Sequence, residues 1–218
     1  MRSRPQKRKI ANWASRAPHR YGDDHMSVRL PAPERKDQIL EVALRVFAER
    51  GFHETSMNDV AEAAGITKPV VYQHFASKRA LFLAIIEDVG HQMIESVTSA
   101  SSAQGDGRTK TELGAIAFFQ WVATYNDSFR FLFDSGVRND PEFTTAIQNV
   151  LDSMAQAIAP LISNKIEPER LDLLAHGVVG TCESVARHLI VQRTAFDPQE
   201  VGRMVAELVW GGLREIVG

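Results

Sequence analysis

Polar and basic side chains between residues 56 and 78 are spaced in a way that could bind a polyanion. Thr67 and Ser77 stand where two helices are predicted to begin, and the free amides and dipole of a helix N-terminus attract phosphate. Lys68 and Lys78 follow them directly, and a lysine can bind phosphate oxygens or the O6 and N7 of a guanine. The chemistry that this segment favours is contact with nucleic acid.

Two short helices joined by a glycine turn would hold these side chains in place. Ser56 can cap the first helix, with Asp59 three residues later in the capping-box position. Gly65 can supply the positive φ of the turn, Thr67 is a second N-cap, and Pro69 fits the first turn of the helix that follows. Helix, turn and helix in this order form the helix-turn-helix pattern. The second helix, predicted over 68–74, would expose Lys68, Val70, Tyr72, Gln73 and His74.

The remaining segments also have helical spacing, and no strand-like alternation persists. The first helix is expected over about 34–50, where Ile39, Ala43 and Phe47 fall on one face and Gly51 ends it. A long fourth helix is expected to start directly after Ser77. Loop and proline breakers then separate helices over about 109–126, 127–134, 141–163, 168–193 and 198–216. The sequence therefore predicts an all-α fold of nine helices.

The first 33 residues contain four prolines and little periodicity, so we expect a basic, mostly unstructured arm. Residues 1–30 carry eight Lys and Arg side chains against two Asp, although the whole chain has a net charge of −2. Three interpretations stay open. The arm could follow a polyanion near the N-terminus, it could be a solvated tail, or translation could begin at Met26.

Other classes of function find little support in the sequence. The chain contains no Gly-x-Ser-x-Gly, P-loop, dinucleotide-binding fingerprint or His-Glu-x-x-His, so we expect no cofactor and no catalysis, and keep a helical enzyme only as an alternative. Cys182 is the only cysteine, which excludes an internal disulfide and a thiolate zinc site and makes the cytoplasm the default location. No apolar run nears the roughly 20 residues that cross a membrane.

Residues 35–89 resemble the DNA-binding domain of TetR-type transcriptional regulators. The resemblance rests on Val-Phe-Ala-Glu-Arg-Gly-Phe (46–52), Thr-Ser-Met-Asn-Asp-Val-Ala (55–61), Ala-Gly-Ile-Thr-Lys (64–68), Val-Tyr-Gln-His-Phe (71–75) and Ser-Lys-Arg-Ala-Leu (77–81). It implies a helix-turn-helix DNA-binding domain at 34–80 and an effector-binding and dimerisation domain at 81–218. It also implies a homodimer on a palindromic double-stranded operator, with DNA affinity set by an effector. A constitutive or architectural DNA-binding protein without an effector is the alternative.

The same resemblance assigns roles at the DNA by position. Lys78 would clamp a phosphate, while base contacts would fall mainly to Lys68, through guanine, and to Val70, through a thymine methyl. The other positions would meet phosphate and the wall of the major groove. The full set expected at the DNA is Ser56, Asn58, Thr67, Lys68, Pro69, Val70, Tyr72, Gln73, His74 and Lys78.

Aromatic side chains concentrate between residues 118 and 143, where they could form ordinary core or line an apolar pocket between helices. The candidate effector-binding residues are Phe118, Phe119, Val122, Phe129, Phe133, Met154 and Cys182. A narrower resemblance, to the actinobacterial regulators of fatty-acid synthesis that sense long-chain acyl-CoA, rests on residues 68–78, Phe-Arg-Phe-Leu-Phe (129–133) and Trp-Gly-Gly-Leu (210–213). It implies a small apolar effector, with long-chain acyl-CoA as the example.

The last two predicted helices are apolar or small over much of their circumference. Their apolar positions are Leu171, Leu174, Val178, Cys182, Val185 and Leu189 in one helix and Val201, Met204, Val205, Leu208, Val209, Leu213 and Ile216 in the other. Gly177, Gly180, Thr181 and Ser184 add a small-residue face. One side can pack on the protomer's own core and the other on a partner, so we expect a homodimer through these two helices. Internal helices of a monomer are the alternative.

Overall fold

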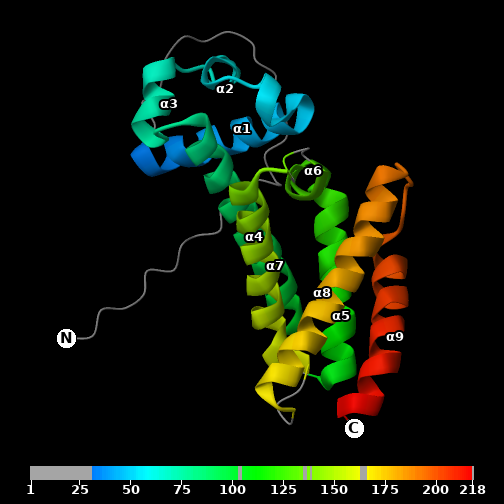
Figure 1. Cartoon of the computed structure of the whole chain (residues 1–218). Helices are drawn as coiled ribbons and strands as arrows, with labels where there is room; N and C mark the ends of the chain where they lie inside the picture. Colours follow the sequence, from blue (N-terminus) through cyan, green and yellow to red (C-terminus); the bar gives the residue numbers. More distant parts are fainter. Residues whose placement is uncertain (1–30, 103–104, 135–136, 138, 163–165, 218) are drawn as a thin grey trace, which may run out of the picture. The chain divides into compact units, whose positions relative to one another are not determined.

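The computed structural model describes residues 31–102, 105–134, 137, 139–162 and 166–217. Within these ranges the chain forms nine helices and no strand, which confirms the predicted all-α fold. Residues 32–218 make one compact unit, in which the first three helices gather at one end and the others form a bundle (Figure 1). The arm predicted over 1–33 lies outside the described residues, except for its last three positions.

The helices follow the predicted breakers closely. Their bounds are α1 Ala32–Glu54, α2 Met57–Ala63, α3 Lys68–His74, α4 Lys78–Ser101, α5 Gly107–Thr124, α6 Asn126–Asp134, α7 Pro141–Ile162, α8 Pro168–Val191 and α9 Pro198–Val217. None of the helices in the described ranges combines the length and hydropathy that crossing a membrane requires.

Helix α1 differs from its predicted span at both ends. It begins at Ala32, and helical residues resume after Gly51 to reach Glu54. Gly51 itself has φ 78° and ψ 169°, so the expected positive φ is present and produces a kink rather than a stop. The carbonyls of Phe52, His53 and Thr55, which follow this kink, accept hydrogen bonds from Lys78 at the start of α4.

Two glycines allow the long helices of the bundle to cross closely. A Cβ on Gly202 of α9 would lie 2.6 Å from the Cα of Ile116 in α5, and one on Gly90 of α4 would lie 2.6 Å from a methyl of Val150 in α7. At both positions only hydrogen fits between the helices. These crossings fix α5 against α9 and α4 against α7, and so shape the interior of the bundle.

Candidate nucleic-acid interface and ligand cavity

The N-terminus of α2 is fixed by a reciprocal capping box. The backbone N–H and hydroxyl of Ser56 both donate to the Asp59 carboxylate, at 2.7 and 2.6 Å, and the Asp59 N–H donates to the Ser56 hydroxyl at 3.2 Å. The hydrogen bonds from Ser56, helped by Arg50, lower the pKa of Asp59. The predicted box is confirmed, but it engages the one proton of the Ser56 hydroxyl. Ser56 therefore stabilises α2 and cannot donate to a phosphate while the box is closed, whereas Asn58 is exposed one residue further into the helix.

Helix α3 presents most of its side chains to solvent. Gly65 has φ 64°, as the turn requires, and only Val71 of α3 is buried against the other helices. Thr67, Lys68, Pro69 and Gln73 are exposed, Tyr72 is 44% exposed, and Val70 and His74 are half-buried. The Lys68 ammonium lies 5.9 Å from the centre of the Tyr72 ring. The structure therefore brings the predicted contacts of α3 together on one accessible helix.

Thr67 occupies the N-cap of α3, but its hydroxyl makes no capping hydrogen bond. An N-cap side chain normally accepts from the second or third N–H of the helix. The second helical residue here is Pro69, which has no N–H, and the third, Val70, donates to the Thr67 carbonyl at 2.9 Å. The hydroxyl expected to cap α3 is thus left free and exposed at the helix N-terminus.

Lys78 has a different environment from the one expected of a phosphate clamp. Its ammonium donates to the backbone carbonyls of Phe52 and Thr55, both at 2.7 Å, and of His53 at 3.3 Å. It also lies 4.5 Å from the centre of the Phe52 ring. An ammonium has three N–H donors, and three carbonyls accept from it. In this structure Lys78 therefore joins the end of α1 to the start of α4, and its phosphate contact stays a prediction.

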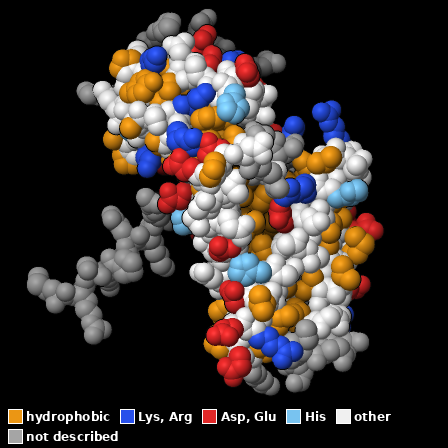
Figure 2. Space-filling model, viewed as in Figure 1, with side chains coloured by type: hydrophobic (Ala, Val, Ile, Leu, Met, Phe, Trp, Pro, Cys, Tyr) orange, Lys and Arg blue, Asp and Glu red, His pale blue; other side chains and the backbone are white. Residues whose placement is uncertain are grey.

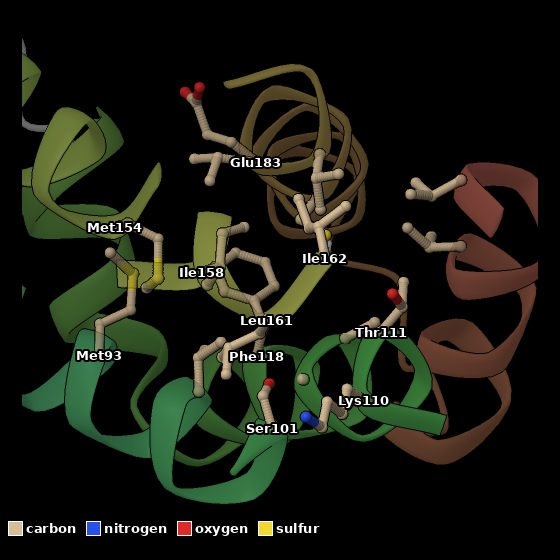
Figure 3. A pocket seen from close by; sticks show the side chains of 18 of the residues that line it. Met93, Ser101, Lys110, Thr111, Phe118, Met154, Ile158, Leu161, Ile162 and Glu183 are labelled. Atoms are coloured by element: carbon tan, nitrogen blue, oxygen red, sulfur yellow. The ribbon is translucent and has the colours of Figure 1, made fainter. Parts of the chain in front are cut away.

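A narrow apolar cavity lies inside the bundle between α4, α5, α6, α7, α8 and α9 (Figure 3). Its volume is about 60 Å³, within a partly open hollow of about 720 Å³. From Met93 to Ser101 it follows α4 for about 12 Å, at 1.5 Å per residue. Its apolar lining includes Met93, Val97, Phe118, Phe133, Leu151, Met154, Ile158, Val178 and Cys182. Such a lining suits an apolar ligand.

The structure separates the seven candidate effector-binding residues into two groups. Phe118, Phe133, Met154 and Cys182 line the cavity, as predicted. Phe119, Val122 and Phe129 do not line it and are fully packed in the core, with exposures of 1% or less. Their helix faces point into the helix contacts of the bundle rather than into the lumen, so we correct that part of the prediction. The polar lining residues Ser101, Lys110, Thr111 and Glu183 were not predicted.

Cys182 contributes to the cavity as an apolar group. Burial raises the pKa of its thiol to about 12, so the sulfur is not a thiolate. Among the described residues, no group of three His, Cys, Asp or Glu side chains is placed to hold a metal ion.

An aromatic cluster joins the helix-turn-helix end to the bundle. Phe82 of α4 lies 5.1 Å from Phe47 of α1, 4.5 Å from Phe131 of α6 and 4.6 Å from Phe143 of α7, measured between ring centres. Phe52 lies 4.9 Å from Phe143. Buried rings in this arrangement resist independent motion. A displacement of α6 or α7 would therefore reach α1 and α4 directly.

An ion pair spans the same junction on the surface. Arg79 of α4 donates two hydrogen bonds to the Asp140 carboxylate, at 3.0 and 2.6 Å, and its guanidinium stacks 4.6 Å from the centre of the Phe143 ring. Asp140 also accepts from the first amides of α7. The hydrogen bonds from Arg79 lower the pKa of Asp140 to about 2. The N-termini of α4 and α7 are thus tied together.

Helices α8 and α9 leave apolar side chains exposed on the outside of the bundle (Figure 2). Leu173 is 73% exposed, Leu208 69% and Met204 59%. Gly177 and Gly180 have no side chain, and no atom lies within 4 Å of a Cβ added at either position. The helix backbone is therefore accessible from outside at these two residues. Exposed leucines next to glycines allow a helix of another protein chain to pack closely against this surface.

Comparison with known proteins agrees with this arrangement. Residues 39–85 match the family model described as bacterial regulatory proteins, tetR family, and residues 107–212 match the tetracyclin repressor-like C-terminal domain. The chain belongs to the TetR family of transcriptional regulators. Like other members, it binds DNA through its helix-turn-helix, so the predicted TetR fold and class of function are confirmed.

Several individual relatives align with this TetR-family protein over most of its length. The HTH-type transcriptional activator FasR of Mycolicibacterium smegmatis is 28% identical over 211 residues, which is 95% of this chain and 96% of FasR. A TetR-like transcriptional regulator from Rhodococcus sp. RHA1 is 29% identical, with a TM-score of 0.69 over 85% of this chain and 99% of its own. The fatty acid degradation regulator FadR from Bacillus halodurans is 19% identical and shares the fold, with a TM-score of 0.74 over 85% of this chain and 99% of that one.

Proposed function

We propose that this TetR-family protein is a homodimeric regulator whose affinity for a palindromic operator changes when an acyl ligand, such as a long-chain acyl-CoA, enters the bundle. The observation that carries the proposal is the narrow apolar cavity beside α4, the helix that begins at the helix-turn-helix. A DNA-binding protein without an effector would need only a solid core. The cavity therefore favours a ligand-responsive regulator over a constitutive one.

At the DNA, α3 enters the major groove with its exposed N-terminal half. Lys68 contacts a guanine and the half-buried Val70 a thymine methyl, while Thr67 and Tyr72 hold the phosphates. The exposure of Lys68, Tyr72 and Gln73 and the free hydroxyl of Thr67 support these roles. Ser56 and Lys78 support DNA binding indirectly, because they hold α2 and α4 in position.

The dimer forms through the outer faces of α8 and α9, where Leu173, Met204 and Leu208 are exposed in the protomer. Burying one such leucine stabilises a contact by about 1.5–3 kcal/mol, and a two-fold axis doubles every contact. Pairing these faces sets the separation of the two α3 helices, which a palindrome requires to be about 34–36 Å or a multiple of it. The described C-terminal helices thereby set the spacing that determines DNA affinity.

Effector binding acts through α4. The cavity wall includes Met93, Val97 and Ser101 in the C-terminal half of α4, while its N-terminal turn carries Lys78 and Arg79. A ligand that widens the cavity shifts α4 relative to α7, and the phenylalanine cluster passes the shift to α1. The effector can change DNA affinity only as far as it prefers one of the two arrangements.

The test is a fluorescence-anisotropy titration of the protein on the DNA flanking its own gene, at fixed salt, with and without palmitoyl-CoA. The proposal predicts a specific complex whose dissociation constant changes at least fivefold with the ligand. A specific complex that ignores palmitoyl-CoA and every other acyl ligand would contradict the effector part of the proposal and leave the DNA-binding part standing.

A further inference from the structure

The lower end of the cavity differs chemically from the rest of its lining. Most lining side chains are hydrocarbon or sulfur, but Ser101 and Lys110 lie near each other where α4 ends and α5 begins, with Thr111 next to Lys110 in the sequence (Figure 3). A Cβ on Gly114 would lie 2.4 Å from the Ser101 hydroxyl oxygen, so α4 and α5 are in close contact there. Lys110 is one helical turn before Gly114 on the same helix. The Lys110 ammonium and the Ser101 hydroxyl therefore lie at the same end of the cavity.

Ser101 is buried without a partner for its hydroxyl. Its side chain is 4% exposed, it lines the cavity, and no described residue makes a hydrogen bond with its oxygen. Figure 3 shows that oxygen pointing into the lumen. A ligand oxygen that reaches this hydroxyl through the lumen can therefore accept a hydrogen bond from it.

Among the residues that the structure describes, Lys110 is the only cationic side chain that lines the cavity. It is half-buried, and within the described ranges no carboxylate or hydrogen-bond acceptor pairs with it. Thr111, by contrast, already donates its hydroxyl proton to the Gly107 carbonyl at 2.8 Å. Glu183 lies further along the cavity and is paired with Arg187. Among the described side chains that line the cavity, the donors without a hydrogen bond are thus Lys110 and Ser101, at one end.

We infer that the cavity binds an unbranched acyl chain in one orientation, with its carboxyl or carbonyl oxygen held by the Lys110 ammonium and the Ser101 hydroxyl. The tail then extends past Phe118 toward Met93 and Met154. The inference rests on the proposed function, because it concerns the ligand of the same cavity. A free carboxylate and the carbonyl of a thioester share the recognised oxygen, and the two sources can be separated by experiment.

The experiment is isothermal titration calorimetry of the full chain with sodium palmitate, palmitoyl-CoA and 1-hexadecanol, each below its aggregation concentration. Lys110→Gln should weaken the binding of palmitate at least tenfold, since hydrogen bonds to charged groups contribute most, and leave hexadecanol within twofold. Lys110→Arg should restore most of the loss. Arg108→Gln is the matched control, because Arg108 is exposed two residues earlier on α5 and does not line the cavity.

Ser101→Ala distinguishes a role of Ser101 in ligand binding from a role in the stability of the protein. Because the hydroxyl has no hydrogen bond within the described protein, the variant should melt at the same or a higher temperature, yet bind palmitate or palmitoyl-CoA more weakly. A greater loss for palmitate identifies a free carboxylate as the head group, and a greater loss for palmitoyl-CoA identifies the thioester carbonyl.

Equal affinity of wild type and Lys110→Gln for all three ligands would overturn the orientation, even where ligand binding still changed operator affinity as proposed above. If the wild-type protein bound none of the three ligands, the inference that the cavity binds an acyl chain would be wrong.

Discussion

Replacing Lys78 by methionine distinguishes a residue that supports the DNA-binding end from one that touches DNA. The two partly buried hydrogen bonds to the carbonyls of Phe52 and Thr55 involve a charged donor, and each such bond contributes about 1.5–3 kcal/mol. Water can replace part of this at a partly exposed site, while the contact with the Phe52 ring adds about 0.5–1 kcal/mol. We therefore expect Lys78→Met to lower the free energy of unfolding by about 2–4 kcal/mol.

Two assays on the same protein separate the possible roles of Lys78. Urea unfolding gives the loss of stability, and operator binding at several salt concentrations gives the number of phosphates contacted, because each contact contributes about −0.9 to the slope of log K against log salt. We expect a destabilised protein with an unchanged slope. Lys68→Met is the matched control, since the exposed Lys68 should affect operator affinity and leave unfolding within about 0.5 kcal/mol. A stable Lys78→Met protein whose slope falls by about one would refute the supporting role.

Three further perturbations test the bundle, the dimer and the junction. Gly202→Ala should lower the melting temperature, because its Cβ would lie 2.6 Å from the Ile116 Cα and overpacking costs about 1–3 kcal/mol; an unchanged melt would mean that α5 and α9 can part freely. Leu208→Glu should give a folded monomer in sedimentation experiments with weakened operator binding, and an intact dimer would exclude this face. Asp140 has a pKa near 2 in the folded protein against an ordinary 3.8, so its pairing with Arg79 stabilises the fold above about pH 4 and is lost as pH falls toward 2. The difference in melting temperature between wild type and Arg79→Gln should shrink over that range, and a constant difference would contradict the ion pair.

The sequence predicts the DNA-binding end well where the structure is determined by neighbouring residues. The capping box of Ser56 and Asp59, the positive φ of Gly65 and the Ser77 cap each depend on groups within a few positions of one another. The contacts of Lys78 with backbone carbonyls could not be predicted, because these acceptors lie 23–26 residues earlier, after the kink at Gly51. Local pattern contains no information about such a distant contact.

The cavity could be predicted only in part for a similar reason. Aromatic density correctly pointed to α5 and α6, yet adjacent phenylalanines separate: Phe118 lines the lumen, whereas Phe119 packs into the core and lies 6.4 Å from Phe196. Which face looks inward depends on the crossing angles of six helices, which glycines such as Gly202 help to set. Ser101 and Lys110 were missed because a serine and a lysine near a helix end are typical of exposed surface, and only tertiary packing reveals that Ser101 is buried.

The central claim is that one protein couples an acyl ligand to operator DNA, and thermodynamic reciprocity tests it most directly. The dissociation constant of palmitoyl-CoA should be measured by calorimetry for the free dimer and for the dimer saturated with operator, at the same salt concentration. Coupling requires that operator DNA change ligand affinity by the same factor by which the ligand changes operator affinity. We predict matching factors of at least fivefold. A ligand affinity that is identical with and without operator would show that the cavity and the helix-turn-helix act independently, and would contradict the account.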